Sequence, residues 1–242
     1  MSKHCIFFKL IIIIFFVLPV SAQQQEDSLT AQQILDKMMS VYAKCDTYMD
    51  EGEVVTTFML NEKSSRIVKP FSTAFVRGSN FRFEYQQQTT EGLRRYIIWQ
   101  NNTDVKEWTF LKPEIIDTKS LGLALAGASG VSSESAYIAP YLLMPDLYNT
   151  NKKHYFKYLE SLTLVGKERR NNKEIYKVSA VCNDPLSDLT LWIDCENFLL
   201  VQLNKTRVNT YSGYNEETKI TYKPRFNIDI PTEKLSFDPP TN

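Results

Sequence analysis

The sequence predicts a mostly β protein of the α+β class, in which a curled antiparallel sheet is covered by an N-terminal helix and a central insert of short helices. Apolar and polar residues alternate at a period of two along most of the chain, which is typical of strands. One segment near the N-terminus has helical periodicity instead. The segment Thr118–Tyr148 is apolar, nearly uncharged and rich in small residues, and it separates two blocks of strands.

Residues 1–22 have the features of a cleavable secretory signal peptide. Lys3 and Lys9 precede the apolar run Leu10–Val20, and a small-residue cleavage pattern follows this run. We therefore expect a soluble protein exported to the periplasm, with a single domain over residues 23–242. An uncleaved membrane anchor is the less favoured alternative, because the apolar run is short for a membrane span.

The charge balance argues against nucleic-acid binding. The chain has 28 basic and 28 acidic residues. Because the leader carries two lysines and no acid, the mature part is slightly acidic. A nucleic-acid-binding protein needs a basic face, so we expect no nucleic-acid partner.

Three cysteines remain after the leader, namely Cys45, Cys182 and Cys195. In an oxidising compartment one internal disulfide is a candidate. Cys182 and Cys195 bracket one predicted hairpin and would not lie opposite each other if its strands pair closely, so Cys45 with either of them is the freer pairing. Buried unpaired thiols remain an equal alternative. No cysteine or histidine spacing suits a zinc site.

The mature chain begins with a predicted amphipathic helix over Ala31–Ala43. Thr30 and Gln33 have the spacing of a capping box. Ile34 and Met38 recur at helical spacing, so one face of this helix is expected to be buried against the sheet.

The first block of strands follows the helix. Its alternating segments are separated by short turns, which predicts antiparallel neighbours. We expect strands over the segments Val54–Leu60, Phe71–Phe75, Asn80–Tyr85, Tyr96–Trp99 and Val105–Phe110.

The insert Thr118–Tyr148 then interrupts the strands. Pro140 is expected to break any continuous helix, which predicts two or three short helices. Its glycines lack both the P-loop ending and the GxGxxG spacing, so the insert is not a phosphate loop.

A second block of strands and a proline-rich tail complete the domain. The tail Ile228–Pro240 is expected to form an edge, because prolines cannot donate ladder hydrogen bonds. We expect strands at Leu159–Leu164, Ile175–Cys182, Leu189–Asp194, Phe198–Arg207 and Glu217–Tyr222.

No constellation for covalent catalysis stands out. His154 is the only histidine outside the leader, so a Ser-His-Asp triad lacks support, and Gly-x-Ser-x-Gly is absent. The acid pairs Asp50–Glu51 and Asp184 with Asp188 are interpreted as solvated turn residues. We therefore expect no enzymatic activity, no metal and no cofactor.

The apolar insert and the aromatic strands instead predict a binding site for a hydrophobic ligand. A curled sheet filled by one helix and one small insert leaves a concave apolar surface, and such surfaces are common ligand sites. The expected lining is Ile34, Met38, Phe81, Phe83, Tyr85, Trp99, Leu123, Leu125, Tyr141, Leu142 and Met144.

The order of these features resembles the LolA/LolB-like superfamily of periplasmic proteins, which includes outer-membrane lipoprotein carriers and the regulator RseB. The resemblance rests on LTAQQILDKMMSVYAKCDTYMDEGEVVTTF, on LTLWIDCENFLLVQL and on IDIPTEKLSFDPP. It implies an open antiparallel half-barrel closed by short helices, with residues 118–148 as plug and lid. It also implies that a strand-borne arginine latches the lid; the candidates are Arg66, Arg77, Arg82 and Arg95.

The resemblance implies a periplasmic carrier or chaperone for lipids or acylated lipoproteins on the way to the outer membrane. Such a protein is expected to bind acyl chains without covalent chemistry, as a monomer, with transient contact to a membrane protein. The alternative is an envelope sensory or protein-interaction module on the same fold, with a protein partner and no lipid ligand.

Overall fold

The computed structural model describes residues 29–60, 63–148, 156, 159–183, 186–209 and 214–240. The expected signal peptide, His154 and Asp184 lie outside these ranges.

One antiparallel sheet runs through the described residues, in the order β6-β5-β4-β3-β2-β1-β11-β10-β9-β8-β7, with β12 paired to β1. The order starts at β6 and ends at β7, so the sheet is open, and the predicted mostly β fold with antiparallel neighbours is confirmed. The strands are β1 (Thr47–Leu60), β2 (Lys63–Val76), β3 (Asn80–Thr89), β4 (Gly92–Asn101), β5 (Asp104–Thr109), β6 (Lys112–Asp117), β7 (Glu160–Arg170), β8 (Lys173–Asn183), β9 (Leu186–Asp194), β10 (Leu200–Asn209), β11 (Tyr214–Tyr222) and β12 (Arg225–Phe226).

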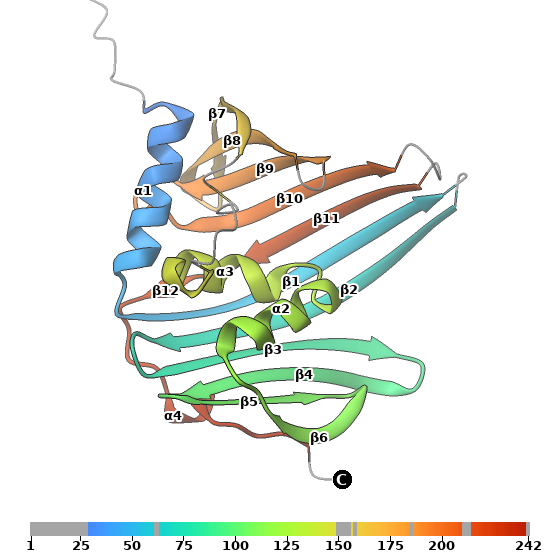
Figure 1. The fold of residues 1–242 in the computed structure, drawn as a ribbon. Helices are drawn as coiled ribbons and strands as arrows, with labels where there is room; N and C mark the ends of the chain where they lie inside the picture. The colour runs from blue at the N-terminus through green and yellow to red at the C-terminus, as the bar shows by residue number, and fades with distance from the viewer. Residues whose placement is uncertain are drawn as a thin grey trace, which may run out of the picture.

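The two blocks of strands meet on β1. Consecutive strands pair within each block, whereas β1 also pairs with β11, and Val54 lies opposite Ile220. The pairing of β1 with β11 therefore joins the two blocks at the centre of the sheet, where these two strands lie side by side (Figure 1).

Residue alternation gives the sheet an inner and an outer face. Along β3, Phe81, Phe83 and Tyr85 belong to the apolar core of the inner face. Arg82 and Glu84 point to the other face, because successive side chains of a strand alternate.

Helix α1 (Ala31–Lys44) stands across one end of the sheet, as Figure 1 shows. Its buried residues include Ile34 and Met38. The capping box is confirmed: Gln33 N donates to Thr30 Oγ1 at 3.2 Å, and Thr30 N donates to Gln33 Oε1 at 2.8 Å. The helix ends one residue later than predicted.

Replacing Thr30 with alanine is expected to lower the free energy of unfolding by about 1 kcal/mol, because one side of the capping box is lost. Urea denaturation measures the change. Thr30→Ser keeps the hydroxyl and is the matched control, and an equal loss in both variants contradicts a capping role.

The insert forms α2 (Leu121–Val131), α3 (Ser135–Leu143) and the 3-10 helix η1 (Pro145–Tyr148), which confirms the prediction of short helices. The predicted break at Pro140 is wrong, because α3 runs through this residue. The break lies instead at Ser133 and Glu134, which have φ of 51° and 71°. Proline removes a single backbone donor, and α3 ends only three residues after it. Both helices lie over the inner face of the sheet (Figure 1).

The C-terminal tail covers the outer face. After β12 it includes the short helix α4 (Thr232–Leu235). Arg82 Nε donates to Ser236 O at 2.8 Å, and Trp99 Nε1 donates to Leu235 O at 2.7 Å. The tail therefore does not form the expected edge. Instead, the tail crosses β3 and β4 and is held there by side chains of the sheet.

The cysteines do not form the bridges considered above. Cys45 and Cys195 are free thiols. Cys45 is buried, and its Sγ lies 3.2 Å from Tyr42 O, to which it donates. Neither candidate disulfide from Cys45 is therefore present.

Candidate hydrophobic-ligand site

The inner face of the sheet, α1 and the insert together enclose most of the predicted ligand-binding residues. Met144 packs against this apolar cluster and is partly buried. The predicted residues that lie within the cluster are Ile34, Met38, Phe81, Phe83, Tyr85, Leu125, Tyr141 and Leu142.

Two predicted residues do not join this cluster. Trp99 lies opposite Arg82 in the β3–β4 ladder, so it faces outward, where its ring packs against Phe237. Its neighbour Ile98 holds the inward position in β4. Leu123 is 58 % exposed, because it projects from the solvent side of α2.

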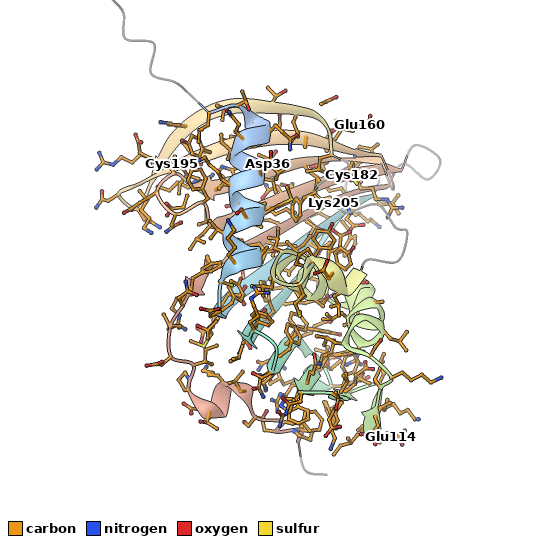
Figure 2. All side chains as sticks on the ribbon, turned by 60° about the vertical axis from the view of Figure 1, so that its left-hand side comes forward. Asp36, Glu114, Glu160, Cys182, Cys195 and Lys205 are labelled. Carbon is orange, nitrogen blue, oxygen red and sulfur yellow. The ribbon has the colours of Figure 1, made fainter. Side chains whose placement is uncertain are left out.

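The interior is filled by side chains of the protein itself. The rings of Tyr85 and Tyr96 stack with their centroids 5.6 Å apart, and the ring centroids of Tyr141 and Phe156 are 6.1 Å apart. Figure 2 shows side chains from the sheet and the helices occupying the space between them. A ligand that occupies this interior must therefore displace part of the insert.

The turn between α2 and α3 is attached to the sheet by polar contacts. Lys69 Nζ donates to Val131 O, and Lys205 Nζ forms an ion pair with Glu134. Thr56 Oγ1 donates to Ser133 Oγ at 3.2 Å. Lys205 lies between the sheet and the two helices (Figure 2). We refer to residues 131–134 as the insert tip.

Arg77 attaches the other end of the insert. Its Nη1 donates to Leu143 O at 3.1 Å, its Nη2 to Tyr42 O at 3.1 Å and its Nε to Cys45 O at 2.8 Å. It thereby joins the C-terminal ends of α1 and α3. Among the four arginine candidates, Arg77 is the one that contacts the insert, whereas Arg82 and Arg95 pair with Glu84 on the outer face.

A cavity of about 370 Å³ lies beside the insert tip. Burial lowers the pKa of Lys69, and the negative charge of Glu216 partly opposes this effect. The residues lining the cavity are Phe58, Lys69, Ser129, Gly130, Ser133, Glu134, Lys205, Arg207, Glu216 and Thr218.

Asp50 is a buried acid on the inner face, and its interpretation as a solvated turn residue is wrong. It lies within β1 and is fully buried. Tyr48 Oη donates to Asp50 Oδ2 at 2.6 Å. Burial raises the pKa of Asp50 from 3.8 to about 6, against the opposing hydrogen bond from Tyr48.

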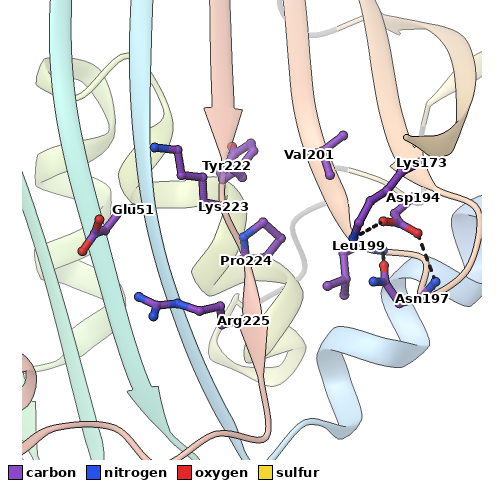
Figure 3. A pocket seen from close by; sticks show the side chains of 10 residues that line it. All are labelled: Glu51, Lys173, Asp194, Asn197, Leu199, Val201, Tyr222, Lys223, Pro224 and Arg225. Carbon is purple, nitrogen blue, oxygen red and sulfur yellow. Dashed lines mark hydrogen bonds and ion pairs between the residues drawn. The ribbon is translucent and has the colours of Figure 1, made fainter. Parts of the chain in front are cut away.

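A second cleft of about 510 Å³ opens where β11 ends, between β1 and β10 (Figure 3). Glu51, Lys223 and Arg225 line it, and Lys173 Nζ lies 3.1 Å from Asp194 Oδ2. This charged lining does not suit an apolar chain.

Comparisons with known proteins support only a likeness of structure. No protein-family model matches the chain, and no curated protein matches it. The chain is similar to a LolA superfamily protein from Nitrosomonas europaea, with 14 % identity over 87 % of this chain and 99 % of that one and a TM-score of 0.34. Proteins of the LolA superfamily are thus among the structures that it resembles.

Two mycobacterial structures are also similar. LprF from Mycobacterium bovis matches with 12 % identity and a TM-score of 0.47, over 83 % of this chain and 94 % of that one. The lipoprotein LppX from Mycobacterium tuberculosis matches with 10 % identity and a TM-score of 0.45, over 83 % and 97 %. The architecture described above rests on the strand order and register of the chain itself.

Within residues 29–240, apart from the gaps named above, no three His, Cys, Asp or Glu side chains gather closely enough to hold a metal ion. None of the helices in that part has the length and apolar character needed to cross a membrane.

Proposed function

We propose that this protein binds the acyl chains of a lipid or an acylated lipoprotein, without covalent chemistry, in the space that α2 and α3 occupy. The observation that carries the proposal is the attachment of the insert. Its apolar side chains cover the inner face of the sheet, while polar contacts at its tip and at Leu143 O hold it in place. Such an insert can exchange with an apolar ligand of similar shape.

The energetics favour exchange over entry into an empty cavity. An acyl chain gains about 25 cal/mol per Å² of apolar surface removed from water. Since the insert already covers the inner face, a ligand gains only the difference between its own contacts and those of α2 and α3. This balance favours reversible binding, which suits a carrier that must release its cargo.

The site of action in this proposal is the periplasm, and the direction of transport is towards the outer membrane. Support comes from the signal-peptide features of residues 1–22 and from the sequence resemblance described above. The carrier is proposed to act as a monomer that meets a membrane protein transiently when it loads or unloads.

A reversible tether tests whether the insert must move. In the double variant Thr56→Cys with Ser133→Cys, the new thiols replace hydroxyls 3.2 Å apart, so oxidation can bond the insert tip to β1. We expect the oxidised variant to bind a fluorescent fatty acid at least about 10-fold more weakly than the reduced one. This ratio of dissociation constants corresponds to a difference in binding free energy of about 1.4 kcal/mol.

The wild-type chain, oxidised and reduced in parallel, controls for Cys45, Cys182 and Cys195. Native mass spectrometry of protein purified from membranes supplies a second readout. Wild-type protein that takes up neither fatty acids nor lipopeptides contradicts acyl-chain binding, and full binding by the oxidised variant contradicts exchange with the insert.

The filled interior favours one alternative, an envelope sensory or protein-interaction module without a lipid ligand. In that case the packed core is permanent and the surface contacts a partner protein. A stoichiometric protein partner recovered from envelope extracts, with no lipid bound, supports this alternative.

A further inference from the structure

Two lysines lie on the mostly apolar inner face of the sheet. Lys69 of β2 and Lys205 of β10 are 9 % and 8 % exposed. Lys69 pairs with Val54, and Lys205 pairs with Thr218, so both belong to rows of inward-pointing residues. Two strands separate them, yet both reach towards the same short segment, the insert tip.

The insert tip supplies the acceptors that these ammonium groups contact. Lys69 Nζ donates to Val131 O and lies 3.4 Å from Ser133 Oγ, to which it also donates. Lys205 Nζ pairs with the carboxylate of Glu134. A buried cation without acceptors is costly, because desolvation is no longer offset by hydrogen bonds. The tip therefore supplies acceptors to both cations that the sheet places in the interior, and Glu134 neutralises one of them.

Displacement of the insert removes these acceptors. With the tip in place, three basic and two acidic side chains line the adjacent cavity: Lys69, Lys205 and Arg207 against Glu134 and Glu216. If Glu134 leaves with the tip, the sheet retains three basic side chains and one acidic side chain, an excess of two positive charges. An uncharged ligand leaves this excess uncompensated, whereas an anionic group takes the place of the Glu134 carboxylate.

We propose that the cavity beside the insert tip binds the anionic head of an amphiphile whose acyl chain replaces the insert, with Lys69 and Lys205 holding a carboxylate or phosphate. This inference rests on the proposed function and narrows it to acidic amphiphiles. The cavity of about 370 Å³ has room for either group. Glu134 and the ligand head then compete for the same ammonium group.

Probes that differ only in the head group test the inference on the full chain. Palmitoyl lysophosphatidic acid and palmitoyl monoacylglycerol share one chain and differ by the phosphate. We expect wild-type protein to bind the phosphate form at least about 10-fold more tightly, and the double variant Lys69→Met with Lys205→Met to bind both alike. Lys219→Met is the matched control, because Lys219 lies opposite Val55 on the outer face and is exposed.

A second variant tests the competition directly and does not depend on folding of the lysine variant. Glu134→Gln removes the negative charge of the insert tip, so we expect it to bind lysophosphatidic acid several-fold more tightly than wild-type protein does, with little change for monoacylglycerol. Unchanged affinity for lysophosphatidic acid in Glu134→Gln overturns the competition between Glu134 and the ligand head.

The outcomes separate this inference from the function on which it rests. Equal binding of both probes by wild-type protein overturns the head-group site but leaves acyl-chain binding intact. Failure to bind either probe overturns both. Inorganic phosphate alone is expected not to displace lysophosphatidic acid at equal concentration, and displacement by it identifies a site for free anions instead of amphiphiles.

Discussion

Replacing Glu84 with glutamine is expected to lower the free energy of unfolding at pH 7 by about 3 kcal/mol. The reason is that the substitution removes the buried carboxylate with which Arg82 and Arg95 both pair. Arg95 donates to Oε1 and Oε2 of Glu84 at 2.8 and 2.9 Å, and Arg82 donates to Oε2 at 2.6 Å. The side chains of Glu84 and Arg82 are 7 % and 9 % exposed. Asp238 retains part of the pairing with both arginines. Urea denaturation measures the loss.

The pH dependence of this loss follows from the pKa of Glu84. Burial alone would raise this pKa, but the hydrogen bonds from Arg95, Gln86 and Arg82 outweigh burial and lower it from 4.5 to about 2. The stabilisation is therefore present above pH 4.5 and is lost as the pH falls towards 2. We expect the difference between Glu84→Gln and wild-type protein to shrink over that interval.

Glu91→Gln is the matched control for Glu84→Gln. Glu91 pairs with Arg94 at 2.7 Å, but its side chain is 76 % exposed. Exposed ion pairs contribute little, so this variant is expected to change stability by less than about 0.5 kcal/mol. Similar losses in the two variants would show that burial of the Glu84 pair has no special effect.

The Glu84 network also shows where prediction from the sequence stops. Alternation along β3 correctly places Phe81, Phe83 and Tyr85 on one face and Arg82 on the other. It does not indicate what covers the outer face, because the C-terminal tail arrives there from more than 130 residues away along the chain, as the Arg82–Ser236 separation of 154 shows. The predicted ligand lining therefore includes Trp99, although this residue lies opposite Arg82 in the β3–β4 ladder and so shares its outward face.

Charged residues buried on the inner face follow the same alternation. Lys69 precedes Phe71 by two positions and Lys205 follows Leu203 by two, so alternation alone places both lysines on the inner face. Asp50 is separated from Tyr48 and Val54 by even numbers of residues, so alternation places it on the inner face as well. A charged residue at a position that alternation assigns to the buried face is therefore a signal that the sequence itself contains. The partners of these lysines were not predictable, because the insert tip reaches them only through the fold.

Replacing Asp50 with asparagine is expected to raise the free energy of unfolding by about 2 kcal/mol at pH 7.5. Burial raises the pKa of Asp50 from 3.8 to about 6, a shift that costs the folded state about 3 kcal/mol above pH 6. An asparagine oxygen can still accept from Tyr48 Oη, while one unpaired amide group offsets part of the gain.

The sign of the pH dependence distinguishes this effect from a change in packing. The stabilisation from protonated Asp50 is fully present below pH 3.8 and is lost as the pH rises through 6. Urea denaturation from pH 4 to 7.5 should therefore show a gap between the variant and wild-type protein that widens with pH. Glu51→Gln changes an acid on the outer face that is 55 % exposed, and it is expected to leave the profile nearly unchanged. A difference in free energy of unfolding that is constant over this range contradicts titration of Asp50. An Asp50→Asn variant that is less stable than wild-type protein at pH 7.5 shows that the carboxylate is paired more strongly than its contact with Tyr48 indicates.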